Sequence, residues 1–170
     1  MRYSNTFLLG LIISACINLP VQADTSKTET DLLSDIAKDG MLEVKLGKLA
    51  EEKASDAGVK SFAAHMVKDH SQANDKLIAA AAKDHVTLPA NISADQQRTF
   101  DSLAKLSGNE FDKKYVTEMV AGHDKAVSAI RKEKDTGSGN SKTWAVETLP
   151  TVEEHRKEAV SLNAKIGHSI

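Results

Sequence analysis

The stretch 59-VKSFAAHMVKDHSQANDKLIAA-80 decides the fold that the sequence predicts. Apolar or small residues recur in it at alternating steps of three and four positions, which is the spacing of a helix packed inside a bundle. One of these core-facing positions holds a histidine, His70. The full set of core-facing residues is Val59, Phe62, Met66, His70, Ala73, Leu77 and Ala80.

Similar helical patterns fill most of the remaining chain. The long helices are predicted at residues 31–54, 59–85, 109–134 and 141–166, with turns near residues 55–58 and 135–140. A short helix is predicted at 93–106. This order predicts an all-α four-helix bundle with a long crossover, containing the short helix, between the second and third long helices. The alternative is an irregular helical array whose last helix splays at Pro150.

The composition is that of an ordinary globular, helix-rich protein. The chain has 170 residues, of which 41% are hydrophobic and 4% aromatic, and few are glycine or proline. With 22 basic and 24 acidic residues the net charge is −2, which argues against nucleic acid as the main partner. This length suits one domain, which we place at residues 31–168.

The N-terminal residues are typical of an export signal. An apolar run of 13 residues, Phe7–Leu19, is too short to span a bilayer, and Val21–Ala23 fits a small-x-small cleavage pattern. We therefore predict a signal peptide at 1–23 and a flexible N-terminus at 24–30, followed by no transmembrane segment. The predicted location is the periplasm. The alternative is a lipoprotein anchored through Cys16, since residues 13–16 resemble a lipobox.

Four polar residues are predicted to lie at one level of the bundle. Glu43 and His70 lie nearly equally far from the turn near residue 57, and His123 and His155 from the turn near residue 138. At about 1.5 Å per residue, antiparallel neighbours then bring each pair to the same height. Because the crossover returns the chain to the first end, all four side chains are expected near mid-bundle.

Burial of four polar groups needs a physical reason. One interpretation is a single transition-metal ion, such as iron, copper or zinc, held by Glu43, His70, His123 and His155. Met66 and Met119, one turn before two of these histidines, are softer alternative ligands that would suit copper(I). A second interpretation is a hydrogen-bonded core network with no metal. A third is that the four side chains do not face one another.

Three acidic residues next to the core histidines are also candidate members of the site. Asp69, Asp124 and Glu154 each adjoin one of them in the sequence. Each is interpreted either as an acceptor that orients a histidine or as a solvated surface charge.

Several segments together resemble one bacterial family of exported proteins. They are Glu43–Ala50, Val59–Ala63 leading to Asp69 and His70, Leu106–Gly108, Phe111 and Asp112, Tyr115 with Met119 and His123, and Leu149–Val152 running to His155. The chain is identified as a member of domain-of-unknown-function family 4142, whose members often carry an outer-membrane or exported label. The resemblance implies a ferritin-like four-helix bundle.

The sequence departs from ferritin-type sites at the positions of the metal ligands. A di-iron centre takes a Glu from each of two helices and a Glu-x-x-His motif from each of the other two. Here Val67 and Val152 stand three positions before His70 and His155, and the third long helix offers His123. A standard di-iron oxidase centre is therefore not expected, and the prediction favours a single-metal site or none.

The resulting functional prediction is an exported envelope protein that binds a metal ion at mid-bundle, in stress protection or metal handling. The alternative is a non-catalytic envelope interaction or structural protein whose buried Glu and His cluster is a hydrogen-bond network. A metal-dependent oxidoreductase is the third hypothesis. An envelope partner or a homodimer is the expected kind of assembly.

Overall fold

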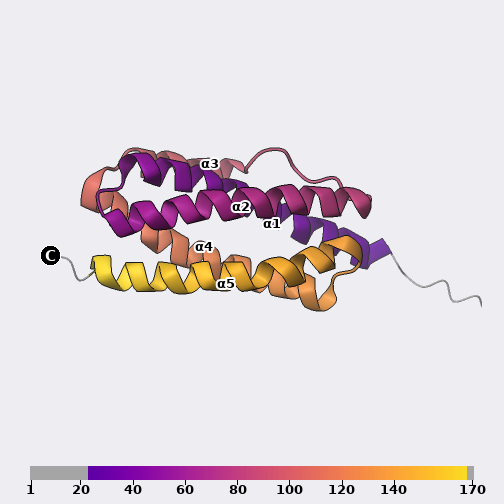
Figure 1. Ribbon diagram of the computed structural model, residues 1–170. Coiled ribbons are helices and arrows are strands. Elements are labelled where there is room, and N and C mark those ends of the chain that lie inside the picture. Colours follow the sequence, from indigo (N-terminus) through magenta and orange to yellow (C-terminus); the bar gives the residue numbers. More distant parts are fainter. Residues whose placement is uncertain (1–22, 168–170) are drawn as a thin grey trace, which may run out of the picture.

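Four long helices and one short helix make up residues 23–167, the part of the chain that this computed structural model describes (Figure 1). The side chains are described from residue 28 onward. The described residues contain no strand. The predicted all-α helical bundle is confirmed. Its helices are α1 (Ala23–Lys53), α2 (Ala57–Lys83), α3 (Ala94–Ala104), α4 (Gly108–Thr136) and α5 (Gly139–Gly167).

The long helices form two antiparallel hairpins that face each other. A short turn joins α1 to α2, and another joins α4 to α5. Helix α1 lies beside α4 and α2 beside α5, so the four helices enclose one core (Figure 1). Helix α5 continues through Pro150 and packs on both α2 and α4, so the alternative array with a splayed last helix is wrong. Packing on two neighbours outweighs the one backbone hydrogen bond that proline removes.

Each end of the bundle is fixed by an aspartate from another helix. Asp112 of α4 accepts hydrogen bonds from backbone N–H groups of the α1–α2 turn, at 2.9–3.2 Å. Asp84, at the end of α2, accepts them from the first backbone N–H groups of α5, at 3.0 and 2.7 Å. Helix α4 therefore begins beside the α1–α2 turn and ends near the end of α2. Residues 84–107, which include α3, lead the chain from one end to the other.

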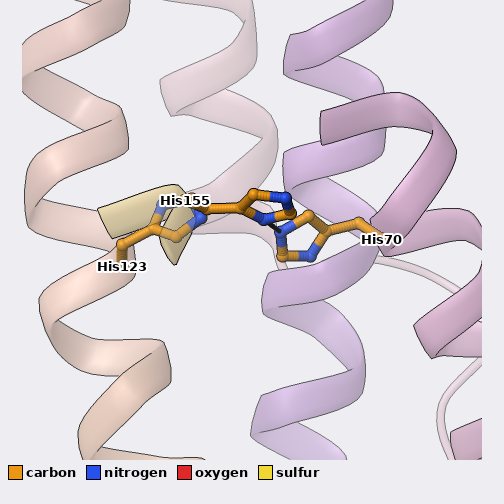
Figure 2. A group of neighbouring side chains, drawn as sticks. All are labelled: His70, His123 and His155. Carbon is orange, nitrogen blue, oxygen red and sulfur yellow. Dashed lines mark hydrogen bonds between the residues drawn. The ribbon is translucent and has the colours of Figure 1, made fainter. Parts of the chain in front are cut away.

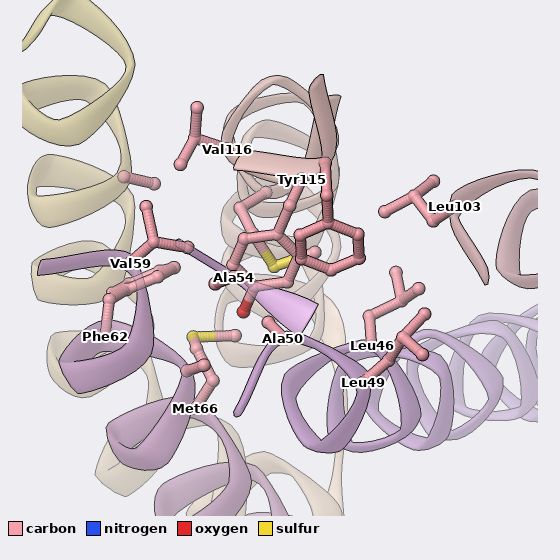
Figure 3. Close-up of a cluster of buried hydrophobic side chains, with 14 of the residues drawn as sticks. Leu46, Leu49, Ala50, Ala54, Val59, Phe62, Met66, Leu103, Tyr115 and Val116 are labelled. Carbon is pink, nitrogen blue, oxygen red and sulfur yellow. The ribbon is translucent and has the colours of Figure 1, made fainter. Parts of the chain in front are cut away.

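Two apolar clusters fill the interior on either side of the middle. The first cluster lies toward the α1–α2 turn, where α3 also contributes a leucine (Figure 3). Its largest members are Leu46, Leu49, Val59, Phe62, Met66, Leu103, Phe111, Tyr115, Val116, Met119 and Ile166. The second cluster lies toward the α4–α5 turn. It includes Leu33, Ile36, Leu77, Ala126, Val127, Ile130, Trp144, Leu149 and Val152.

Helix α1 already includes the segment that precedes the predicted domain. Residues 24–30, expected to be a flexible N-terminus, belong to a helix that starts at Ala23. Glu29 gives a physical reason, because its carboxylate accepts hydrogen bonds from the backbone N and the hydroxyl of Ser138, at 2.9 and 3.2 Å. The predicted signal peptide, apart from Ala23, lies outside the described residues, and so does Cys16. No helix in residues 23–167 is both long enough and apolar enough to cross a membrane.

Candidate metal centre

The structure brings the four predicted polar residues together at mid-bundle. Glu43 comes from α1, His70 from α2, His123 from α4 and His155 from α5. Their exposed fractions are 4%, 4%, 0% and 5%. One ring nitrogen of each histidine lies within 4.8 Å of one from each of the other two (Figure 2).

This level is the boundary between the two apolar clusters. Along α2, His70 stands between Met66 of the first cluster and Leu77 of the second. Along α4, His123 stands between Met119 and Ala126 in the same way. The heptad spacing that buries the apolar residues therefore also buries the histidines. Bundle packing fixes where these side chains lie.

Each histidine makes one hydrogen bond away from the centre, to a group that can only accept. His123 Nδ1 donates to the carbonyl oxygen of Met119 at 2.8 Å. His70 Nδ1 donates to Glu43 Oε2 at 3.0 Å. His155 Nε2 donates to Asp69 Oδ2 at 3.1 Å. Because a carbonyl and a carboxylate offer no proton, these contacts place a proton on the outward nitrogen of each ring.

The remaining ring nitrogens face the centre. His70 Nε2 and His155 Nδ1 are 3.2 Å apart. His123 Nε2 is buried and has no hydrogen-bond partner among the described residues. If all three rings are neutral, the nitrogens of His70 and His155 present lone pairs to each other, which is repulsive. Either one additional proton or a cation must lie between them.

The charges around the centre also favour an additional positive charge beside His70. Burial alone would raise the pKa of Glu43, but the charge of His70 and its hydrogen bond hold that pKa down at about 2. Burial lowers the His70 pKa, yet the facing Glu43 carboxylate raises it above its ordinary value. Burial and the neighbouring His70 charge lower the pKa of His155 to about 4. Without a metal, Glu43 and His70 therefore form a buried ion pair beside neutral rings.

The family assignment was tested by comparison with known proteins. The sequence profile of a family described as a domain of unknown function, DUF4142, matches residues 16–162. The chain belongs to the DUF4142 family. The family predicted from the sequence is thus confirmed. Searches of the curated proteins and of the solved structures found no match to this DUF4142 chain.

Glu43 holds a different place in this DUF4142 bundle from the three histidines. It is not in the group whose ligand atoms converge. Its Oε2 binds His70 Nδ1, and its Oε1 lies 3.6 Å from His123 Nδ1, on the protonated side of both rings. Gly122 leaves room beside Oε1, since a Cβ there would lie 3.5 Å away. Glu43 thus orients the ring of His70, while its Oε1 has no hydrogen-bond partner among the described residues. Its role as a direct ligand stays a prediction.

The methionines and acidic neighbours separate into different roles. Met66 (Figure 3) and Met119 are members of the first apolar cluster. The carbonyl oxygen of Met119 accepts the hydrogen bond from His123. Asp69 is an acceptor, but for His155 of another helix rather than for its neighbour in sequence. Asp124 instead pairs with an arginine and Glu154 with a lysine at the surface.

Sequence reasoning missed two contacts of the centre. The ring of Phe62 lies 6.4 Å from those of both His123 and His155, and so covers the cluster on the side of the first apolar cluster. The second missed contact is the hydrogen bond that His155 Nε2 donates to Asp69. The spacing of Asp69 and His70 gave no signal for it, because the acceptor and the donor are 86 positions apart.

Proposed function

We propose that this DUF4142 protein binds one transition-metal ion at mid-bundle through His70, His123 and His155. The observation that carries the proposal is the orientation of the rings. All three have the outward nitrogen bonded to an acceptor, and one nitrogen of each ring converges with the others in the buried interior. Histidine metal ligands characteristically donate their second N–H to a carboxylate or a backbone carbonyl, which fixes the tautomer and the ring.

The ligand set narrows the chemistry. Imidazole nitrogens suit iron, copper and zinc, and three protein ligands leave a coordination position open. A buried cation there would be balanced by Glu43 at one side and Asp69 at the other. These features support metal handling or stress protection as the role of the protein.

The proposed setting is the bacterial envelope. The apolar run at Phe7–Leu19 and the pattern at Val21–Ala23 support export into the periplasm. Release as a free protein or anchoring through a lipid on Cys16 are the two forms that this export would take. We further propose that the protein assembles there with a partner of the envelope or with a second copy of itself.

A metal-free structural network is the second candidate, and one observation favours it. Asp69, His155, His70 and Glu43 form a continuous chain of contacts of 3.1, 3.2 and 3.0 Å. One additional proton, on His70, would satisfy every link of that chain. In this case the protein would be a non-catalytic interaction or structural protein of the envelope.

Metal content decides between the two candidates. The protein, purified without a polyhistidine tag, is loaded with iron, copper, zinc or manganese in turn, dialysed and analysed by mass spectrometry. We expect retention of about one equivalent of one metal, and its loss in His70→Ala/His123→Ala.

The matched control is His65→Ala/His85→Ala, which removes two exposed histidines and should keep the metal. Circular dichroism of each variant checks that the helices persist. Failure of the folded wild type to retain any of the four metals would leave the structural network as the function.

A further inference from the structure

A cavity of about 170 Å³ lies between α2 and α5, against the proposed metal centre. Its inner wall includes His70, His155 and Asp69. Its outer part is lined by side chains at the surface, among them Glu147 and Thr151, both exposed. The cavity therefore connects solvent with two of the three histidines.

Asp69 and His155 form the inner wall between this cavity and the centre. The Asp69 side chain is 32% exposed, so it reaches solvent while Oδ2 contacts His155 Nε2. The other nitrogen of the same ring, Nδ1, faces His70 at 3.2 Å. A cation held by Asp69 would thus be separated from the converging nitrogens by one imidazole ring.

The other cavities are poorer routes for a cation. A second one also touches Glu43 and His70, but its volume of about 20 Å³ holds roughly one water molecule, and it is lined mostly by apolar side chains. A third, between α4 and α5, is lined by four basic and three acidic residues, and none of the three histidines lines it. The α2–α5 cavity instead presents two carboxylates, Asp69 and Glu147, against one lysine, Lys76.

We propose that the α2–α5 cavity is the entrance through which a transition-metal cation reaches the three histidines, with Asp69 as its first protein ligand. The proposal rests on the metal-binding function above. It predicts that the charge and width of the cavity mouth control the rate of metal uptake, while the three histidines control the affinity. Carboxylates at the mouth attract the cation, and Lys76 opposes it.

The chain contains its own reporter for the test. Its single tryptophan, Trp144, lines the small cavity that Glu43 and His70 also line. Bound Cu²⁺ should quench its fluorescence, so stopped-flow mixing with Cu²⁺ gives association rates. Chasing the loaded protein with a chelator gives dissociation rates.

Thr151→Phe narrows the mouth without touching a ligand. We expect association and dissociation both to slow by about tenfold, with the dissociation constant nearly unchanged, because a blocked route affects both directions equally. The control Val160→Phe adds the same bulk to an exposed position of α5, and should leave both rates at wild-type values.

Charge variants give an independent test at low ionic strength. We expect Glu147→Gln to slow association by about 2- to 5-fold and Lys76→Gln to speed it by a similar factor. Asp75→Asn removes an exposed carboxylate of α2 that does not line this cavity, and should have no such effect.

The outcomes separate the entrance from the binding site. If Thr151→Phe and both charge variants still bind Cu²⁺, with the association and dissociation rates of the wild type, the proposed entrance is wrong. The proposed metal-binding function would then still stand. Absence of Cu²⁺ binding by the wild-type protein, together with no retention of the other metals, would overturn both.

Discussion

Two buried glutamates of this bundle are pushed toward opposite charge states. Glu43 and Glu133 are 4% and 0% exposed. Burial favours the neutral form of both, but Glu43 faces the charge of His70, which holds its pKa at about 2. Burial raises the pKa of Glu133 to about 7, and the negative charges of Glu29 and Asp84 add to the rise. The same side chain is therefore charged in one place and half-protonated near neutral pH in the other.

Glu133 should make stability fall as the pH rises. Its folded-state pKa lies above the ordinary value of 4.5, so the folded protein binds the proton more tightly than the unfolded chain. Stability is then complete below about pH 4.5 and decreases through pH 7. We expect Glu133→Gln to raise the free energy of unfolding at pH 8 by about 1–2 kcal/mol, with little change at pH 5. Urea unfolding at both pH values measures this, and an equal effect at both would contradict it.

Glu43 should act on the metal through the ring of His70, which it orients. Glu43→Gln keeps an acceptor for His70 Nδ1 but removes the charge. We expect metal affinity to fall by about 10- to 100-fold with the stoichiometry unchanged, as for other groups that orient metal-bound histidines. Titration with competing chelators measures the affinity, and Glu133→Gln is the control for a buried Glu→Gln change elsewhere. Loss of all metal in Glu43→Gln would indicate that Glu43 is itself a ligand.

At the scale of the helices, two glycines let α1 approach α2. By helix propensity alone, Gly40 and Gly47 are weak points, each costing about 1 kcal/mol against alanine. In the structure a Cβ on Gly47 would lie 2.8 Å from Val67 Cγ2 and 3.2 Å from the carbonyl oxygen of Ala63. A Cβ on Gly40 would meet the side-chain amide of Asn74. Their small size therefore sets how closely the first hairpin packs.

Gly47→Ala should destabilise the protein despite the better helix former. Valine is stiff at χ1, and the backbone oxygen cannot move alone, so overpacking by about 1–3 kcal/mol outweighs a propensity gain of about 1 kcal/mol. Gly122→Ala is the control, because its Cβ would make only an ordinary contact at 3.5 Å. Denaturant unfolding should show Gly47→Ala less stable than wild type and Gly122→Ala at least as stable. The double variant Gly47→Ala/Val67→Ala should recover part of the loss if the contact with Val67 is the cause.

The sequence predicts the helices and the level of the centre because both depend on regular spacing. The alternating steps of three and four from Val59 to Ala80 identify α2, and distances to the turns place His70 level with Glu43. The same arithmetic places His123 and His155. An error of one residue in the centre of a turn changes the difference in height by about 3 Å, which is still less than one helical turn.

Contacts between distant polar residues lie beyond this kind of reasoning. Asp84 and Asp112 each fix a turn more than 50 positions away, and the contact between Asp69 and His155 spans 86. The helical start of α1 has the same character, because a polar segment is expected to be exposed until its partner is known. The burial of Glu133, whose carboxylate has no hydrogen-bond partner among the described residues, has no sequence signal either. No periodic pattern marks such pairs. The centre was therefore predicted as four equal ligands with Asp69 as a candidate acceptor. That Asp69 accepts from His155 of another helix, and the Met119 carbonyl from His123, emerged only in the structure.

For the whole molecule, a bound metal would join the two hairpins. His70 belongs to the first hairpin, whereas His123 and His155 belong to the second. A metal that binds only the folded protein stabilises it by about 2.7 kcal/mol at a free concentration 100 times the dissociation constant. For a chain of this size, we expect a rise in Tm of about 5–10 °C, measured by circular dichroism.

The rise in Tm should depend on the ligands and not on general binding to the surface. His70→Ala/His123→Ala should show no rise with the same metal, whereas His65→Ala/His85→Ala should show the full rise. Glu43→Gln should show an intermediate rise at a fixed metal concentration, because its weaker affinity lowers the occupied fraction. An equal rise in all four proteins would mean that the metal stabilises the bundle from outside the three histidines, and the centre would then be a hydrogen-bonded core.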